Sequence, residues 1–177
     1  GTITDDVNVD ALLKQMITVS SNEAANGLLS RIGNGDGKAA IATVTAIAQR
    51  YGFTSSEELR TLTGMASGNA VENWTSTRDC GSFLSQVYAG TLVSKNASER
   101  MMQLLLGQTR RTKIPAGVPS GVKVANKTGE LAAVQNDVAI VFGTHPYVLA
   151  VMSNDISSAV APSQITELSR AVWDAAQ

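Results

Sequence analysis

The chain has 177 residues, of which 44% are hydrophobic and 16% are charged. A formal net charge of −1 gives no electrostatic basis for binding nucleic acid or an acidic membrane, and no apolar run of about 18 residues indicates a membrane span. Cys80 is the only cysteine, which excludes an intrachain disulfide, and neither Cys80 nor the only histidine, His145, lies in a cluster typical of a metal site. We therefore expect a soluble globular protein without a metal or other cofactor.

Helical periodicity dominates the first part of the chain. Apolar residues from Val9 to Ile17 predict a helix over residues 9–19 with Asn8 as its N-cap, and Ser20-Ser21-Asn22 then interrupts the pattern. Similar apolar stripes predict helices over residues 24–32 and over residues 40–51. Another helix is predicted from a cap at Thr75 or Ser76 to Tyr88. A further helix is predicted over residues 96–106, opened by the capping box Asn96-Ala97-Ser98-Glu99. Residues 53–74 predict a long loop with a short helix near 56–62, and residues 107–121 predict a connector.

The period then changes to that of strands. Residues 122–127, 137–142 and 147–153 predict a three-stranded antiparallel sheet, with the last two strands joined by a turn at His145. The third strand is apolar on both faces, so we expect it to be covered on both sides. Pro162 predicts the start of a closing helix with an inward stripe of Ile165, Leu168, Val172 and Ala176. The element order predicts one α+β domain over residues 1–177, with a helical part at about 8–110 and the sheet and closing helix at about 120–177.

Two polar segments are candidates for a functional site. On a strand, Lys127 and Gly129 share one face and Thr128 takes the other, so a cation, a hydroxyl and bare backbone lie together where an anionic group can bind. The alternative to an anion-binding site is that Lys127 is a solvated charge at a strand end. Ser20-Ser21-Asn22, between two helices, has a similar alternative, in which Ser20 is a helix cap and Asn22 satisfies its own backbone.

These segments carry a resemblance to a known family. Residues 16–26 resemble the Ser-Asp-Asn segment of class A serine β-lactamases, and Lys127-Thr128-Gly129 is similar to the Lys-Thr-Gly element that follows it in the family. Residues 73–79 resemble the segment after the family's Ω-loop, so the resemblance covers nearly the whole chain in the same order. It implies a β-lactamase/transpeptidase-like fold, shared with penicillin-binding D-Ala-D-Ala peptidases, in which a serine attacks a lactam or peptide carbonyl and forms an acyl-enzyme.

The resemblance also implies roles for individual residues. Ser20 would relay a proton to the leaving nitrogen, and Lys127 would act with it while holding the substrate carboxylate beside Thr128. Substrate-binding roles fall on Asn22, Thr128, Gly129 and Glu130, the last two through pairing of the strand with the substrate backbone. The implied ligand is a β-lactam or a D-Ala-D-Ala peptide-like small molecule. We expect Ser20 and Lys127 to approach each other across a groove between the helical part and the sheet.

Three departures from the family pattern qualify this reading. Ser21 stands where the family usually has Asp, a residue more structural than chemical. No Glu in the chain is followed by Asn four residues later, although Glu57 and Glu58 lie in the region of the family's deacylating Glu-x-x-x-Asn. Efficient β-lactam hydrolysis is therefore in doubt, which favours a D-Ala-D-Ala carboxypeptidase or related penicillin-binding enzyme as the alternative.

The third departure concerns the nucleophile. The family's Ser-x-x-Lys precedes the Ser-Asp-Asn segment, but residues 1–19 contain none, and the one match, Ser120-Gly121-Val122-Lys123, precedes the predicted sheet instead. We expect the nucleophile to be absent from this chain, which resembles the C-terminal portion of a secreted or cell-envelope protein of antibiotic resistance. A second alternative is a non-catalytic carboxylate-binding module. Loss of the family's first strands would leave an exposed sheet edge. A second copy of the chain, pairing at this edge in a homodimer, is one way to cover it.

Overall fold

The computed structural model describes residues 3–62 and 72–177, which divide into two compact units, Gly1–Asp79 and Cys80–Gln177. The organisation of residues 1–177 as a single domain stays a prediction.

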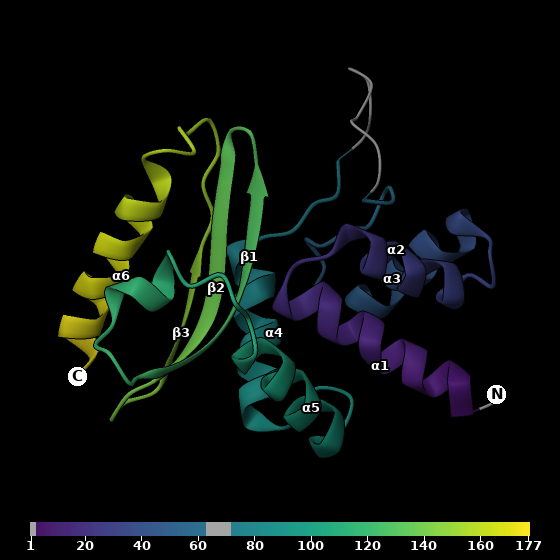
Figure 1. The fold of residues 1–177 in the computed structure, drawn as a ribbon, viewed down its shortest axis with the longest axis horizontal. Coiled ribbons are helices and arrows are strands. Elements are labelled where there is room, and N and C mark those ends of the chain that lie inside the picture. Colours follow the sequence, from purple (N-terminus) through teal and green to yellow (C-terminus); the bar gives the residue numbers. More distant parts are fainter. Residues whose placement is uncertain (1–2, 63–71) are drawn as a thin grey trace. The chain divides into compact units, whose positions relative to one another are not determined.

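The described part of the first unit begins with the helices α1 (Ile3–Thr18), α2 (Asn22–Ile32) and α3 (Gly37–Arg50), in which α1 packs on α2 and α2 on α3 (Figure 1). The predicted N-cap at Asn8 is wrong, because no Gly or Pro interrupts residues 3–8 and the helix continues through Asn8. α2 begins where the polar interruption was predicted. Ser21 is its N-cap, and the Oγ atom of Ser21 accepts a hydrogen bond of 3.1 Å from the backbone N–H of Ala24.

The segment after α3 is a loop held by side chains. The short helix predicted near 56–62 is wrong, because the backbone N–H groups of Leu59 and Arg60 donate to the Oδ1 atom of Asn73 at 2.8 and 2.9 Å instead of to carbonyls one turn earlier. Glu57 and Trp74 form an isolated antiparallel bridge. The remainder of the predicted loop, residues 63–71 with Gly64 and Gly68, lies outside the described residues.

Two further helices follow, α4 (Thr77–Ala89) and α5 (Lys95–Leu106). Of the two caps predicted for α4, Ser76 accepts a hydrogen bond of 3.1 Å from the N–H of Asp79. The capping box predicted at residues 96–99 is wrong. The N-cap of α5 is Ser94, which accepts from Ala97, and the buried Ser98 donates its hydroxyl to the carbonyl of Leu92.

The sheet of the second unit consists of β1 (Lys123–Leu131), β2 (Val134–Phe142) and β3 (Tyr147–Val151), antiparallel in the order β1-β2-β3. β1 and β2 are longer than predicted, because they form a hairpin around residues 132–133 in which Thr128 pairs with Asp137 and Leu131 with Val134. The turn at His145 joins β2 to β3 as predicted. The prediction that β3 is covered on both sides is wrong, since all five of its residues are only half-buried.

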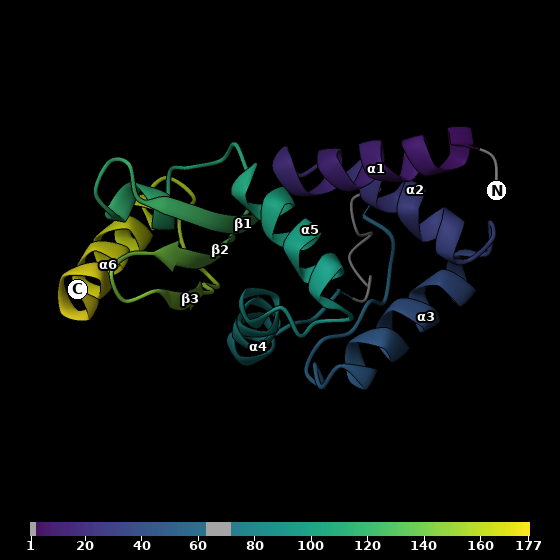
Figure 2. The ribbon, with the colours of Figure 1, turned by 90° about the horizontal axis from the view of Figure 1, so that it is seen from below.

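A short 3₁₀ helix, η1 (Ile114–Gly117), lies in the predicted connector and packs on α6 (Ala161–Ala176). α6 covers one face of the sheet, and α4 and α5 lie on the other (Figures 1 and 2). The core on the α6 side consists of Ile114, Val124, Ala139, Val141 and Ile165. The inward stripe of α6 is Ala161, Ile165 and Ser169. Leu168, predicted to face inward, is 46% exposed because it lies off the four-residue spacing of that stripe.

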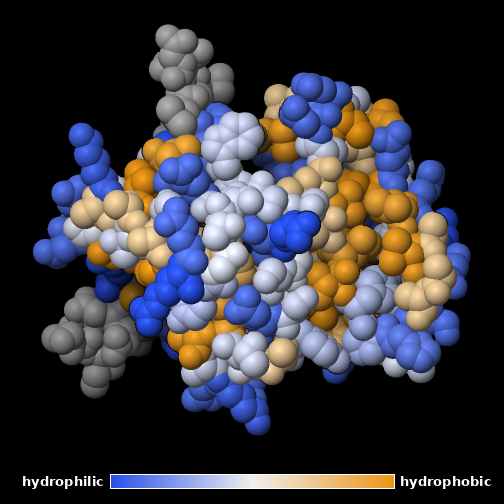
Figure 3. Space-filling model, turned by 180° about the vertical axis from the view of Figure 1, so that it is seen from behind, coloured by the Kyte–Doolittle hydropathy of each residue, from blue (hydrophilic) through white to orange (hydrophobic). Residues whose placement is uncertain are grey.

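Hydrophobic side chains gather on the outer surface of the second unit where β3 lies (Figure 3). β3 ends the sheet on this side, and no other strand in the described ranges pairs with its outer edge. None of the helices in these ranges combines the length and hydropathy that crossing a bilayer requires.

Candidate ligand-binding site

Ser20 and Asn22 lie at the corner between α1 and α2. Ser20 has φ of +61°, a left-handed conformation that is uncommon for a residue with a side chain and that is often retained at functional sites. The alternative in which Ser20 caps α2 is wrong, because Ser21 does so. Asn22 opens α2 with an exposed side chain. The corner therefore presents a half-buried hydroxyl and an exposed amide from one tight turn.

Lys127, Thr128 and Gly129 lie in the middle of β1, the strand at the other end of the sheet from β3. The alternative prediction, in which Lys127 is a solvated charge at a strand end, is wrong. Lys127 is half-buried, and its Nζ atom donates to the carbonyl of Thr128 at 2.5 Å. Thr128 is 5% exposed. A Cβ added to Gly129 would meet only Asn136, at an ordinary contact distance of 3.6 Å, so packing within this unit does not require glycine there.

Two further cations approach this strand from the segment between α5 and η1. Lys113 is 1% exposed, and its ammonium donates to the Oε1 atom of Glu130 at 3.0 Å and to the carbonyl of Asn136 at 3.1 Å. The guanidinium of Arg110 donates to the other oxygen of Glu130, Oε2, at 2.5 Å. The carboxylate of Glu130 is thus shared between an inner and an outer cation.

The charges of the site shift one another's titration. Burial and then the charge of Arg110 lower the pKa of Lys127, against the opposite effects of Glu130 and Asp137. Burial alone would raise the pKa of Glu130, but the hydrogen bond from Lys113 and the charges of Lys113, Arg110 and Lys127 lower it. The positive charges of Lys127, Lys113 and Arg110 outnumber the carboxylate of Glu130 around this strand, which favours an anionic ligand.

A buried polar network fixes the strand from beneath. Asp137, fully buried and opposite Thr128 in register, accepts from the Nδ2 atom of Asn126 and from the N–H of Ile114, both at 3.0 Å. Burial raises the pKa of Asp137 to about 6 against these hydrogen bonds and the charges of Lys113 and Lys127. Arg111 donates to the Oδ1 atom of Asn126, so β1, β2 and the approach to η1 are joined through side chains.

Glu57 and Glu58 lie in the region where the sequence resemblance implies a deacylating carboxylate. The Oε1 atom of Glu58 accepts from the Nδ2 atom of Asn73 at 3.1 Å, and burial raises the pKa of Glu58 against that bond and the charge of Arg60. Both glutamates line a groove of about 390 Å³ against α3, together with Lys38, Ile41, Ala42, Thr45, Ala46, Gln49 and Leu59. Glu58 is therefore tied to the loop as well as facing this groove.

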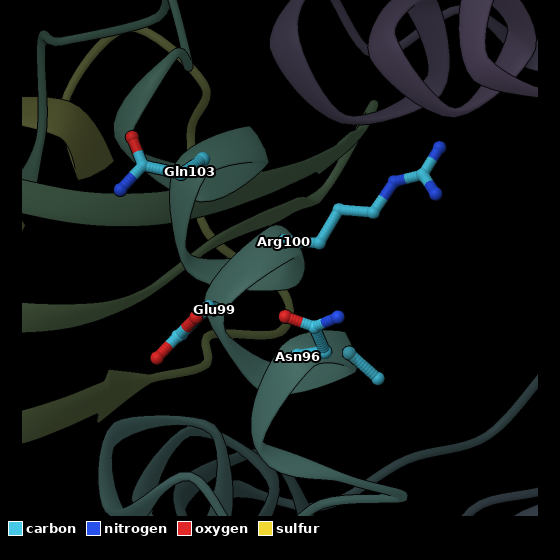
Figure 4. Close-up of a pocket in the computed structure, with 5 residues that line it drawn as sticks. Asn96, Glu99, Arg100 and Gln103 are labelled. Atoms are coloured by element: carbon cyan, nitrogen blue, oxygen red, sulfur yellow. The ribbon is translucent and has the colours of Figure 1, made fainter.

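Two other features contribute no chemistry to the site. Ser120 and Lys123 of the Ser-x-x-Lys match are exposed around a turn with Gly121 at φ +90°, and this turn lies just before β1. A hollow of about 580 Å³ runs along α5, where Glu99 and Arg100 extend in opposite directions, so their charges do not converge on one ligand (Figure 4). In the described ranges, no three His, Cys, Asp or Glu side chains lie together as metal ligands.

The structure brings Lys127, Thr128, Gly129 and Glu130 together on β1, and Ser20 and Asn22 together at the helix corner. The two groups belong to different units, so the approach of Ser20 to Lys127 stays a prediction. Sequence reasoning missed Arg110, Lys113 and Asp137. The cluster Arg110-Arg111-Thr112-Lys113 was its one visible signal, since it is the densest run of positive charge in the chain.

Comparisons with known proteins bear on this arrangement. The profile described as the Beta-lactamase enzyme family matches residues 2–176. A β-lactamase from Sphaerobacter thermophilus DSM 20745 is similar in structure with a TM-score of 0.84 and 24% identity, covering 94% of this chain and 62% of that one. One from Desulfarculus baarsii DSM 2075 has a TM-score of 0.80 and 26% identity, covering 94% and 63%.

PBP-A is also similar in structure, with a TM-score of 0.81 and 26% identity, covering 93% of this chain and 60% of that one. A single-substitution variant of PBP-A was solved as an acyl-enzyme complex with penicillin G. No curated protein sequence matches the chain significantly. This chain spans less than two thirds of the length of each of these solved structures. Because the family profile covers all but the terminal residues and the fold agrees, the chain belongs to the beta-lactamase enzyme family.

Proposed function

We propose that the complete protein is a β-lactam-binding serine hydrolase that works through an acyl-enzyme, and that this chain supplies its carboxylate-binding and proton-relay residues. The observation that carries the proposal is the half-buried ammonium of Lys127, which donates to the carbonyl of Thr128 on an outer strand whose outer edge no other described strand covers. An ammonium suits a substrate carboxylate. Ser20 and Asn22 would act on the leaving nitrogen and the substrate amide.

A specific observation favours the D-Ala-D-Ala peptidase alternative. The chain has no Glu-x-x-x-Asn, and the carboxylate of Glu58 is already bonded to Asn73. An acyl-enzyme without a positioned base loses the typical 10²–10⁴-fold, roughly, that general base catalysis contributes to its hydrolysis. We therefore propose that acylation is fast and release is slow. The similarity to PBP-A, a variant of which holds penicillin G as an acyl-enzyme, is in line with this.

The test is intact mass spectrometry of the protein expressed from the complete gene, mixed with benzylpenicillin. We expect a long-lived adduct of one penicillin. The 177-residue chain alone should give no adduct and no hydrolysis, because loss of a serine nucleophile costs about six orders of magnitude in comparable hydrolases. Rapid turnover by the complete protein would contradict slow release, and failure of the complete protein to acylate would favour the non-catalytic module.

A matched pair of variants isolates the role of Lys127. Lys127→Ala in the complete protein should slow acylation by about tenfold or more, since a hydrogen bond to a charged group contributes about 1.5–3 kcal/mol. Lys123→Ala removes an exposed lysine from the same strand and should leave the rate unchanged. Equal rates for both variants would show that Lys127 does not contact the substrate.

Location and assembly follow from the same proposal. A β-lactam-binding hydrolase meets its substrate outside the cytoplasm, so we place the complete protein in the cell envelope or among secreted proteins, with a role in antibiotic resistance.

We also propose that this chain by itself pairs with a second copy through the outer edge of β3. The half-buried apolar residues of β3, and the lack of a partner strand at its outer edge within residues 3–62 and 72–177, support this.

A further inference from the structure

A hollow separate from the candidate ligand-binding site lies in the second unit, where α4 ends and α5 begins. Its volume is about 310 Å³, within the range of small-molecule pockets. Its lining combines an apolar wall, which includes Tyr88, Met102 and Phe142, with a polar wall formed by Lys95, Glu99 and Gln103. In the part of the chain that the structure describes, no residue of β1 lines it. An apolar surface beside a few polar groups is the usual composition of a ligand pocket.

Two aromatic rings form much of the apolar wall. The ring centroids of Tyr88 and Phe142 are 6.0 Å apart, and the ring planes are tilted by 51°. Tyr88 is 50% exposed, so a large part of its side chain is open to solvent. Aromatic rings associate at this kind of separation and tilt, and the thioether of a methionine such as Met102 also packs well against rings. The wall therefore suits a third aromatic ring, supplied by a ligand.

The polar wall carries one charge of each sign. Lys95 and Glu99 are four residues apart on α5 and so lie on one face of the helix. Glu99 and Gln103 extend to the same side of α5, opposite Arg100 (Figure 4). Among residues 3–62 and 72–177, no ion pair joins the ammonium of Lys95 to the carboxylate of Glu99. Lysine before glutamate is also the less favourable order for such a pair. Both charges are thus available to a ligand.

A strained turn lies at the rim of the hollow. Val93 stands between Gly90 and Lys95, which both line the hollow, and it has φ of +63°. The N–H of Ser94 donates to the carbonyl of Leu92 at 2.7 Å, so Val93 is the central residue of the rare, strained type of γ-turn. A β-branched residue in this conformation is costly, and glycine would relieve the cost. Strain of this kind is concentrated at functional sites.

We propose that this hollow binds a free aromatic α-amino acid in its zwitterionic form. The ligand ring packs against Tyr88 and Phe142, its carboxylate pairs with Lys95, and its ammonium pairs with Glu99. Lys95 is the first residue of α5, where the helix dipole also favours a negative group, so the two charges of the ligand have a defined order. The amide of Gln103 can bond to either group. Such a site is independent of acyl transfer and shares no residue with β1.

The test is an NMR titration of the ¹⁵N-labelled 177-residue chain with L-phenylalanine. We expect saturable shifts of the backbone amides of Gly90, Glu99 and Gln103, and no shift at Lys127. Three probes each lack one part of the ligand. L-Alanine lacks the ring and should give no saturable shift, whereas 3-phenylpropanoate and 2-phenylethylamine each lack one charge. Each of these two should bind about two- to fivefold more weakly, because the charges lie at exposed positions.

Variants assign the parts of the hollow. Tyr88→Ala should weaken binding of L-phenylalanine by about tenfold, and Tyr88→Leu, which keeps apolar bulk without the ring, by about two- to tenfold. Leu168→Ala, at a 46% exposed position on α6, is the control and should have no effect.

The charges are assigned in the same way. Glu99→Gln should remove the preference for L-phenylalanine over 3-phenylpropanoate, and Lys95→Gln should remove the preference over 2-phenylethylamine. Glu167→Gln and Arg170→Gln, which remove the same charges at exposed positions on α6, should preserve both preferences.

Three results would overturn the assignment. Wild-type chain that gives no saturable shift with L-phenylalanine has no such site. Shifts centred on Lys127 would place the ligand on β1 instead. Equal binding of L-phenylalanine and 3-phenylpropanoate, unchanged by Glu99→Gln, would mean that the hollow takes the ring without reading the ammonium. None of these results affects acylation of the complete protein by benzylpenicillin, so failure here is distinct from failure of the proposed function.

Discussion

Asp137 is a buried carboxyl group on β2. It is fully buried, and each of its oxygens accepts one hydrogen bond, from Asn126 and from the N–H of Ile114. Both partners donate in this arrangement, so these two hydrogen bonds favour the ionised carboxylate. Burial nevertheless outweighs these bonds and raises the pKa of Asp137 from 3.8 to about 6.

The sign of the resulting pH dependence follows from linkage. Because the folded chain holds the proton of Asp137 more tightly than the unfolded chain, the contribution of this group to stability is fully present below about pH 4 and is lost as the pH rises through about 6. Above about pH 6 its contribution is constant.

Asp137→Asn tests both statements. The amide N–H₂ of the new side chain would face a donor, so we expect a loss of about 1–3 kcal/mol in the free energy of unfolding. The difference from wild type should be larger at about pH 4.5 than at about pH 7.5, as measured by urea unfolding. Asp174→Asn, at an exposed position on α6, is the control. A difference that grows with pH would mean that Asp137 is stabilised as the anion.

At the scale of elements, the contact between η1 and α6 places the segment that carries Arg110 and Lys113. Gly117 lies at this contact. A Cβ at this position would come within 2.4 Å of the carbonyl oxygen of Thr166 and 2.5 Å of the Cβ of Ser169. The hydroxyl of Ser169 also donates to the carbonyl of Ile114 at 2.9 Å, so α6 and η1 cannot separate without breaking a buried bond.

Gly117→Ala should therefore lower the free energy of unfolding by about 1–3 kcal/mol, the usual effect of overpacking. Thermal unfolding measures it. Gly81→Ala is the matched control, because nothing lies within 4 Å of a Cβ there and alanine favours the helix α4. Equal destabilisation by the two changes would show that η1 and α6 tolerate a wider separation.

At the scale of the whole molecule, the sheet has three strands, and β3 is half-buried along its length. An unpaired apolar edge of this kind is a template for another chain. Light scattering at micromolar concentration should show that the 177-residue chain self-associates.

Val148→Lys should reduce this association, because a lysine on an edge strand disfavours pairing. Val160→Lys, a change at a 47% exposed position outside the sheet, should not. A strictly monomeric wild type would contradict pairing through β3.

The sequence by itself determined the order of helices and strands, the hairpin at His145, the start of α6 at Pro162 and the family, because periodicity, turn residues and short motifs are local signals. It misplaced the cap at Asn8, through which α1 continues, and the cap at residues 96–99, where Ser94 caps α5 instead. It also predicted a helix near 56–62 that the distant side chain of Asn73 replaces with a loop.

Only the tertiary structure decided the surroundings of Lys127. Residues 107–121 read as a connector, yet Lys113 is buried there because its partners, Glu130 and the carbonyl of Asn136, are brought to it by the register of β1 and β2. The burial of Asp137 has the same origin. Charges far apart in the sequence interact only after the hairpin and η1 have packed, and no local pattern records that distance.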